Sequence, residues 1–203
     1  VLSSRPNPDG GIAYQTRFFG DFVGELGGSY QEKNANTVLT AVMQLYNKGV
    51  IKNAESIVKG FAHVCELTGL MGRWQRLQTN PLVICDTGHN AGGWTYLSQQ
   101  IKRQQCTQKR IVFGMVDDKD LHAVMSMLPD DAIYYWTQPS THRAFPVENV
   151  AATANDYDLH GMVYPTVLEA YQAALHDAAQ SDFIFIGGSS YVVADLLTGL
   201  QKK

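Results

Sequence analysis

The sequence contains no run of about 18 apolar residues, which is the length that a transmembrane helix requires. Its first residues lack the basic start and the apolar stretch of a signal peptide. The net charge is −3, so no excess of positive charge is present to attract a nucleic acid. We therefore expect neither a membrane protein nor a nucleic-acid-binding protein.

Cysteine is also scarce, and its three positions lie far apart, at Cys65, Cys85 and Cys106. None belongs to a CxxC pair, which argues against a disulfide framework and against a zinc site. Reduced thiols in a cytoplasmic protein are the predicted state. Cys85 lies inside an apolar run and is expected to be a small core residue.

Three common signatures of catalysis are missing as well. The sequence has no Walker A phosphate loop, no GxSxG nucleophile elbow and no HExxH zinc motif. If the protein uses a nucleotide, the phosphate loop is therefore not on this chain. No set of metal ligands is predicted in this chain either.

The second part of the sequence contains a regular alternation of strands and helices. With 203 residues, of which 45% are apolar and 17% charged, the chain can bury a sizeable core. Apolar runs predict strands at 82–86, 110–114, 132–136, 161–164 and 182–186, and amphipathic segments predict helices at 92–104, 118–128, 147–156, 166–179 and 190–200. This alternation predicts a Rossmann-like, doubly wound α/β domain at 73–203, with a mostly parallel sheet covered on both faces.

Residues 1–72 have a different character and are expected to belong to a separate domain. Residues 1–30 are rich in glycine and aromatics, and the DGG turn at 9–11 predicts short strands, like the last hairpin of a larger sheet. Helices are predicted at 34–48 and 54–67. The first has an apolar stripe formed by Val38, Val42, Leu45 and Tyr46, with Leu39 and Ala41 beside them.

In an open α/β sheet, ligands bind beyond the carboxyl ends of the strands. Four of the five predicted strands end in polar residues, in the segments 86–90, 114–120, 137–143 and 187–190. Because parallel strands end at the same edge of a sheet, we expect these four segments to lie together.

Asp86 and His89, in the segment DTGHN, are the first candidates for a functional site. Asp86 can accept two hydrogen bonds from a diol such as a ribose, and His89 can donate to an anion or orient a neighbour. Asp86 could instead only cap the turn between strand and helix. A third interpretation is a metal-dependent hydrolase, although two ligands fall short of a metal site.

Three further segments could bind anions. In DDKD at 117–120, Asp117 and Asp118 are expected in the first turn of a helix, while Lys119 could bind a carboxylate or a phosphate. GGSS at 187–190 is either an anion cradle before a helix or a plain tight turn. Arg73, in a glycine-rich connector, is either solvated or reaches a phosphate.

Four motifs in order along residues 27–197 resemble a known family. GGSYQEKNANTVLTAVMQL resembles the G-x-Y-Q-x-x-N-A segment of folylpolyglutamate synthase and dihydrofolate synthase. GLMGRWQRL with PLVICDTGHNAGG resembles that family's G-R-W/F-E and D-x-A-H-N-P junction. FGMVDDKD resembles F-G-x-x-x-D-K-D, and FIGGSSYVVADLL resembles T-G-S-x-Y-x-x-x-x-x-L. These enzymes belong to the Mur ligase superfamily, with a P-loop ATPase domain followed by a Rossmann-like C-terminal domain.

The resemblance implies a ligase that uses ATP and Mg²⁺ to activate the carboxylate of a folate or pteroate as an acyl phosphate, which the amine of L-glutamate attacks. Gln31 and Asn34 match positions near the adenine, and Arg73 matches an arginine that reaches the nucleotide phosphates. Asp86 matches an aspartate near the ribose, and His89 matches a histidine required for activity. Asp86 and His89 are thus the catalytic candidates.

Lys119 and Ser189 resemble positions at which related ligases hold the incoming amino acid. Gln75, Gly88 and Ala91 depart from the usual Glu, Ala and Pro of the motifs. The resemblance places the P-loop and the Mg²⁺ ligands upstream of residue 1, so the chain looks like the C-terminal half of such an enzyme.

We expect this chain to be monomeric, inactive alone and dependent on the P-loop part of the same enzyme. A non-catalytic nucleotide- or amino-acid-binding module is the alternative. Dihydrofolate synthase and folylpolyglutamate synthase activities are not distinguished by these motifs.

Overall fold

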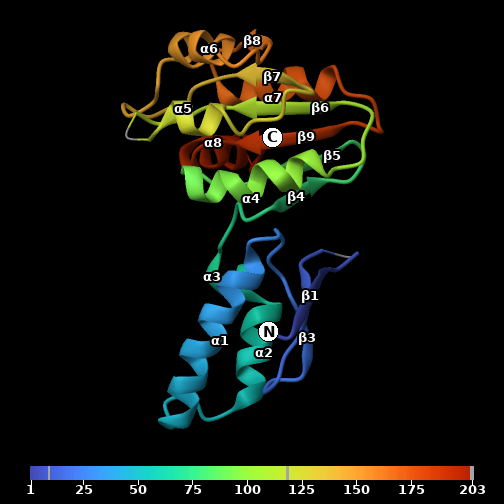
Figure 1. The fold of residues 1–203 in the computed structure, drawn as a ribbon, viewed down its shortest axis with the longest axis vertical. Coiled ribbons are helices and arrows are strands. Elements are labelled where there is room, and N and C mark those ends of the chain that lie inside the picture. Colours follow the sequence, from blue (N-terminus) through green and yellow to red (C-terminus); the bar gives the residue numbers. More distant parts are fainter. Residues whose placement is uncertain (9, 118, 202–203) are drawn as a thin grey trace. The chain divides into compact units, whose positions relative to one another are not determined.

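The computed structural model describes residues 1–8, 10–117 and 119–201. The chain divides into two compact units, Val1–Trp74 and Gln75–Lys203 (Figure 1). The boundary expected from composition, between 72 and 73, lies two residues before this division. No helix in the described ranges is long and apolar enough to cross a bilayer.

The first unit combines a small sheet with three helices. Strands β1 (Ser3–Pro6), β2 (Ile12–Gln15) and β3 (Asp21–Gly24) form an antiparallel sheet in that order. Helices α1 (Gln31–Asn47), α2 (Ala54–Ala62) and α3 (Val64–Thr68) follow. The core of this unit consists of six buried side chains, namely Ile12, Tyr14, Phe22, Ala35, Leu39 and Ile57.

The helices of the first unit differ from their predicted form. α1 begins at Gln31 rather than 34, because Tyr30 already has helical backbone angles (φ −73°, ψ −15°). The predicted helix 54–67 is two helices, because His63 leaves the helical region (φ −131°, ψ 30°).

The predicted apolar stripe of α1 is also wrong in part. The helix buries Ala35 and, of the predicted stripe, Leu39, whereas Val38, Leu45 and Tyr46 are exposed.

The second unit contains a six-stranded, mostly parallel sheet in the order β4-β5-β9-β6-β7-β8. Its parallel strands are β5 (Leu82–Cys85), β6 (Lys109–Phe113), β7 (Ala132–Trp136), β8 (Gly161–Val163) and β9 (Phe183–Gly187). The predicted fold class and all five predicted strands are confirmed, to within one residue at each end. The edge strand β4 (Gln75–Gln78), which pairs antiparallel with β5, was not predicted.

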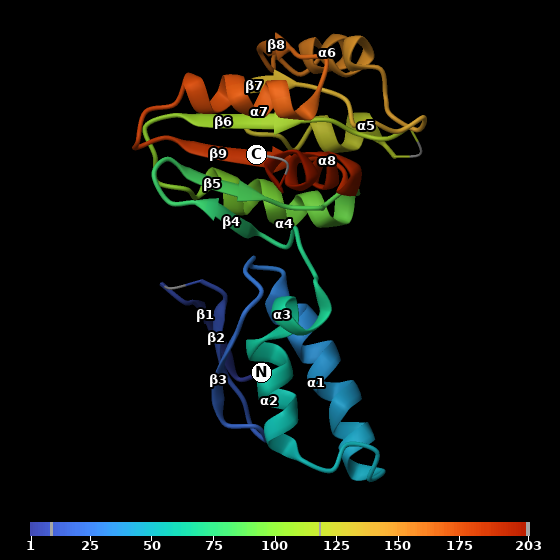
Figure 2. The same cartoon turned by 180° about the vertical axis from the view of Figure 1, so that it is seen from behind.

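Helices cover both faces of this sheet (Figures 1 and 2). The alternation along β9 explains why, since successive side chains of a strand point to opposite faces. Phe185 points to α4 (Ala91–Lys102), where its ring lies 5.8 Å from that of Trp94. Ile184 and Ile186 belong to the core cluster formed with α7 (Val167–His176) and α8 (Ser190–Gln201). α5 (Leu121–Met125) and α6 (Val147–Asn155) follow β6 and β7.

Cys85 confirms its predicted role as a core residue. It is fully buried in the cluster beneath α7 and α8. Burial raises the pKa of its thiol to about 12, so the group stays neutral in the core.

Candidate functional site

The strand order brings four polar segments to one edge of the second sheet. β5, β9, β6 and β7 are parallel neighbours in that order, so their carboxyl ends lie side by side (Figure 1). The polar segments at these strand ends are 86–90, 187–190, 114–120 and 137–143. The prediction that these four strand ends share one edge is confirmed.

Asp86 lies directly after β5 and is only 1% exposed. Its backbone N–H donates to the carbonyl of Ile186 at 3.1 Å, and its Oδ1 accepts a hydrogen bond from the N–H of Gly88 at 2.7 Å. A carboxylate that accepts a backbone N–H two residues later closes a tight turn. Asp86 therefore caps the turn between strand and helix, as one of the sequence-based interpretations predicted, and any ligand role is additional to this cap.

Gly88 fits this turn because Leu97 of α4 occupies the space beside it. A Cβ at Gly88 would lie 2.3 Å from Leu97 Cδ1 and 3.2 Å from Asp86 Oδ1. An alanine here would require Leu97 to move. The departure of Gly88 from the usual alanine of the motif thus has a packing explanation.

His89 is half-buried, and its Nδ1 lies 3.0 Å from the carbonyl oxygen of Thr87. Because a carbonyl oxygen can only accept, Nδ1 carries the hydrogen in this contact, and Nε2 is the nitrogen that can face an external partner. Asn90 then caps α4 by accepting a hydrogen bond from the N–H of Gly93 at 2.8 Å. The local turn therefore fixes the imidazole at the start of a helix.

Gly187, the last residue of β9, and Gly188 let this strand end approach both of its neighbours. Gly188 has φ +100°, and a Cβ on it would lie 2.4 Å from the carbonyl oxygen of Gly114. Ser189 is 1% exposed, and its Oγ accepts a hydrogen bond from the N–H of Tyr191 at 3.2 Å. GGSS therefore forms a tight turn, as one of the two interpretations predicted, and the Ser189 hydroxyl already caps α8.

The segment after β6 differs from its predicted form. α5 begins at Leu121 rather than 118, and Asp120 caps it by accepting a hydrogen bond from the N–H of Ala123 at 2.9 Å. Asp117, predicted in the first turn, lies before the helix and is exposed. Asp118, predicted beside it, lies outside the described residues.

A tertiary pairing accounts for the late start of α5. Val116 forms an antiparallel bridge with Ala144, and the N–H of Asp117 donates to the carbonyl of Arg143 at 2.8 Å. This pairing keeps the chain extended between β6 and α5. Lys119, which follows it, is half-buried.

Two features of this edge were not recognised from the sequence. Thr137, at the end of β7, is fully buried, and its hydroxyl has no hydrogen-bond partner within the described part of the chain. Asp195 of α8 accepts two hydrogen bonds from Ser140, from its N–H at 2.6 Å and from its Oγ at 2.7 Å. No sequence signal links Ser140 with Asp195, because 55 positions separate them.

The remaining candidates belong to the first unit. Gln31 is the first residue of α1 and is 5% exposed, and its Oε1 accepts a hydrogen bond from Asn34 Nδ2 at 3.0 Å. The structure thus brings these two amides together in one helical turn. Arg73 is exposed, and its side chain makes no hydrogen bond or ion pair with the described residues. It follows Gly72, which has φ +71°.

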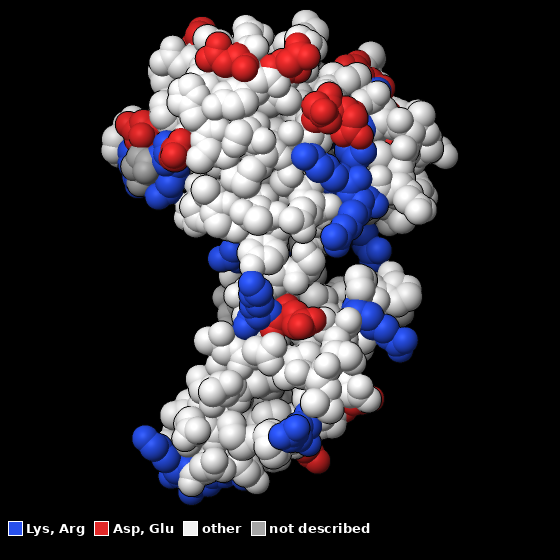
Figure 3. All heavy atoms as spheres, viewed as in Figure 1, with Lys and Arg blue, Asp and Glu red and all other residues white. Residues whose placement is uncertain are grey.

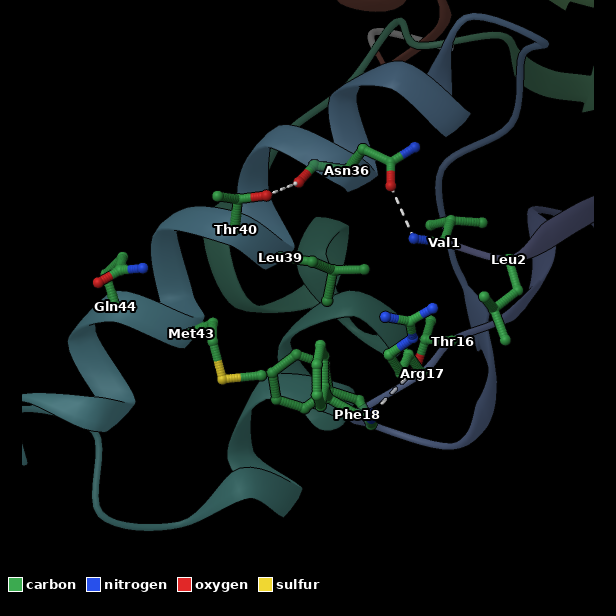
Figure 4. Close-up of a pocket in the computed structure, with 11 residues that line it drawn as sticks. Val1, Leu2, Thr16, Arg17, Phe18, Asn36, Leu39, Thr40, Met43 and Gln44 are labelled. Carbon is green, nitrogen blue, oxygen red and sulfur yellow. Dashed lines mark hydrogen bonds between the residues drawn. The ribbon is translucent and has the colours of Figure 1, made fainter.

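The first unit also contains a cavity of about 390 Å³ (Figure 4). Its walls come from the chain start, the turn after β2 and α1, and include Leu2, Phe18, Leu39 and Met43. None of the candidate residues lines this cavity. It is therefore distinct from the candidate site.

Charged side chains of both signs lie next to one another on the face of the second unit shown in Figure 3.

Within residues 1–8, 10–117 and 119–201, no group of three or more His, Cys, Asp or Glu side chains is arranged to hold a metal ion.

A parallel sheet with polar loops at its carboxyl edge, shaped there by glycines and by helix starts, defines a Rossmann-like ligand-binding domain. The chain belongs to the Mur ligase, glutamate ligase domain family, whose family model matches residues 72–190.

Relatives of the chain carry consistent names. It is 27% identical over 173 residues to the dihydrofolate synthase/folylpolyglutamate synthase of Escherichia coli (strain K12), covering 85% of this chain and 39% of the relative. It is 26% identical over 174 residues to the protein of the same name from Buchnera aphidicola subsp. Acyrthosiphon pisum, covering 80% of this chain and 39% of the relative. The chain therefore spans about two fifths of these relatives.

Solved structures show the same fold. Folylpolyglutamate synthase of Mycobacterium tuberculosis, complexed with ADP, superposes with a TM-score of 0.80 at 22% identity and covers 100% of this chain and 47% of its own. Escherichia coli FolC in complex with DHPP and ADP gives a TM-score of 0.75 at 24% identity and covers 97% of this chain and 45% of its own. At these identities the likeness establishes the fold.

Proposed function

We propose that this chain is part of an ATP-dependent ligase that joins L-glutamate to a folate or dihydropteroate. The observation that carries the proposal is that the polar sheet edge with Asp86, His89 and Ser189 falls inside the region matched by the glutamate ligase domain family. Relatives at this level are named dihydrofolate synthase/folylpolyglutamate synthase, and one solved relative is a complex with both DHPP and ADP.

In the proposed reaction, the terminal phosphoryl group of ATP is transferred to the carboxylate of the acceptor, which gives an acyl phosphate and ADP. The amine of glutamate then attacks the acyl carbon and loses a proton. The amide C–N bond forms, and the C–O bond to phosphate breaks. A divalent metal would neutralise charge on the phosphates, but the described side chains offer no cluster for it, so no step is assigned to metal ligands of this chain.

For the nucleotide, we assign Gln31 and Asn34 to the adenine, Arg73 to the phosphates and Asp86 to the ribose. A buried carboxylate at a strand end can accept hydrogen bonds from ribose hydroxyls, as acidic residues do in nucleotide-binding folds. A guanidinium can pair with phosphate oxygens through two parallel N–H groups. We assign His89 to the reacting centre, because Nδ1 stays bonded to the backbone and leaves Nε2 as the nitrogen that can accept a proton and, once protonated, donate to an anion.

For the incoming glutamate, we assign Lys119 and Ser189. Lys119 supplies a positive charge for a carboxylate. Ser189 caps α8 with its hydroxyl, so its contribution comes together with the positive end of that 12-residue helix. Glutamate carries two carboxylates, and these two groups follow neighbouring strands, β6 and β9.

Phosphoryl transfer needs a phosphate cradle, and the sequence has no Walker A motif. We therefore propose that a P-loop-bearing part of the same enzyme supplies it, and that the 203-residue chain alone does not ligate glutamate. A stand-alone nucleotide- or amino-acid-binding module is the competing proposal.

An ATP-dependent ligation assay with labelled L-glutamate tests the function in the complete enzyme that contains these residues. Dihydropteroate and tetrahydrofolate serve as separate acceptors, which also decides between the two activities. Asp86→Ala and His89→Ala should each reduce ligation on the order of 100-fold. Asp130→Asn, which removes an exposed acid before β7, is the matched control and should leave the rate unchanged.

Two outcomes of this assay would contradict the proposal. Ligation by the 203-residue chain alone would show that no separate P-loop part is needed. No ligation by the complete enzyme with either acceptor would favour the binding module.

A further inference from the structure

Residues 137–145 follow β7 and are called the β7 loop. The proposed function gives roles to the other three polar strand ends but none to this loop. Its backbone is joined to the segment after β6. The N–H of Asp117 donates to the carbonyl of Arg143 at 2.8 Å, and the N–H of Phe145 donates to the carbonyl of Met115 at 3.0 Å. These bonds flank an antiparallel bridge between residues 116 and 144, so the two segments form a short ladder.

On its other side, the β7 loop is held by Asp195 of α8. One carboxylate oxygen of Asp195 accepts a hydrogen bond from the N–H of Ser140 at 2.6 Å, and the other accepts one from its Oγ at 2.7 Å. Because both donors belong to one residue, the two bonds fix both its position and its orientation. Hydrogen bonds to a carboxylate are roughly twice as strong as those between neutral groups.

The two attachments connect the β7 loop to the elements that carry the glutamate candidates. α8 begins directly after Ser189, and the segment after β6 carries Lys119. The β7 loop adds the exposed His142 and the half-buried Arg143. A substrate with two carboxylates needs hydrogen-bond donors at two places, and arginine matches the planar geometry of a carboxylate.

We infer that Asp195 is a positioning residue for recognition of the incoming amino acid. By holding Ser140, it fixes the β7 loop so that Arg143 and Lys119, on two joined segments, bind the carboxylates of L-glutamate. This inference rests on the proposed function and adds a specificity element to it. Asp195 acts through Ser140, since each of its two oxygens accepts a hydrogen bond from that residue.

The first test follows backbone order in the 203-residue chain by residue-resolved hydrogen exchange. Asp195→Asn leaves an acceptor for only one of the two Ser140 donors, so amide exchange in 140–145 should rise about tenfold, the size of one hydrogen bond to a charged group. Ser140→Ala keeps the backbone bond and should give a smaller rise. Asp130→Asn should give none. Unchanged exchange in Asp195→Asn would overturn the inference.

The second test compares kinetic constants in the complete enzyme. Asp195→Asn should raise the KM for L-glutamate about tenfold and leave the KM for ATP within about twofold, whereas general loosening of the fold would change both. An unchanged KM for L-glutamate would overturn the inference and leave the ligase function intact. A wild-type enzyme without ligation would instead refute the proposed function and, with it, the glutamate role of the loop, while the exchange test would still decide the role of Asp195.

Discussion

The two units of this chain have cores of very different extent. Among the described residues, six apolar side chains are buried in the first unit, Val1–Trp74, and 33 in the second, Gln75–Lys203. Exposure shows the opposite trend. Nine of the thirteen exposed large apolar side chains belong to the first unit, namely Leu2, Phe18, Val23, Val38, Leu45, Tyr46, Val50, Leu67 and Met71.

The comparison shows that the length of a helix does not determine how much it stabilises its unit. Hydrophobic stabilisation scales with the apolar area removed from water, at about 25 cal/mol per Å². α1 is 17 residues long, yet it buries only Gln31, Ala35 and Leu39, so it adds little to the core. α8 is shorter, at 12 residues, and buries Val192, Val193 and Leu196 against the sheet. We expect the second unit to be the more stable one.

The largest expected effect is the loss of an aromatic ring from the second core. Phe185 is fully buried, so Phe185→Ala should lower the free energy of unfolding of the second unit by about 3–5 kcal/mol. Phe22→Ala, at a site 8% exposed in the first unit, should cost less, because the smaller core can relax around it.

Urea denaturation followed by residue-resolved NMR distinguishes the two units. Each substitution should shift only the transition of its own unit, with the first unit unfolding at the lower urea concentration. One shared transition that moves equally in both variants would show that the two cores do not act separately.

The second unit could be predicted well from the sequence, because its strands are buried on both faces. FIFIG and LVIC read as continuous apolar runs, which is typical of parallel sheets covered by helices. The parallel order then predicted that Asp86 and His89 lie at the carboxyl edge of the sheet, where the structure has them. β4 escaped prediction because QRLQ is polar and is held by pairing with β5.

What the sequence could not provide depends on contacts between distant residues. The start of α5 was predicted too early because the backbone N–H of Asp117 donates to the carbonyl of Arg143, which keeps this segment extended. The hydrogen bonds between Ser140 and Asp195 join positions 55 apart. In α1, periodicity identified an apolar helix but not which part of its stripe the small core covers. The reaction itself was inferred from the family motifs and not from composition.

The buried ion pair of the second unit provides a second test of the difference between the two units. Arg110 Nε lies 3.0 Å from Asp182 Oδ2, and the two side chains are 12% and 3% exposed. Asp182→Asn would leave a guanidinium poorly paired in a buried place, which should cost about 3 kcal/mol of unfolding free energy.

The matched control for that pair is Asp131→Asn. Asp131 is 58% exposed and pairs with Lys109 at 2.6 Å, so its substitution should cost less than about 1 kcal/mol. Both values come from urea denaturation of the second unit. Equal losses in the two variants would contradict the assignment of Asp182 to the core. In the first unit, the contact between His63 and Glu66 is exposed and offers a comparison.

A smaller effect is expected from the carboxyl group of Asp177. The hydrogen bond from the Tyr135 hydroxyl, at 2.9 Å, and then the contact with His176 lower its pKa below the ordinary 3.8. A pKa lowered in the folded state stabilises the second unit above pH 3.8, and this contribution is lost as the pH falls through the folded value.

Tyr135→Phe removes the main cause of this shift. The pKa of Asp177 should therefore rise towards 3.8, and the part of the acid-induced loss of stability that comes from Asp177 should become smaller. An NMR titration of the Asp177 carboxyl carbon measures this directly. A pKa that stays as low in Tyr135→Phe as in the wild type would assign the shift to His176 and not to the tyrosine.

The smallest effect is expected at the exposed apolar side chains of the first unit. Phe18 lines the cavity beside α1 but is 71% exposed, so most of its ring is in water already (Figure 4). Phe18→Ser should change the unfolding free energy of this unit by less than about 0.5 kcal/mol in urea denaturation, as is usual for surface substitutions. A loss above about 1 kcal/mol would mean that the ring packs as a core residue. The first core would then extend beyond its six buried side chains, and the contrast between the two units would be smaller than their exposed surfaces indicate.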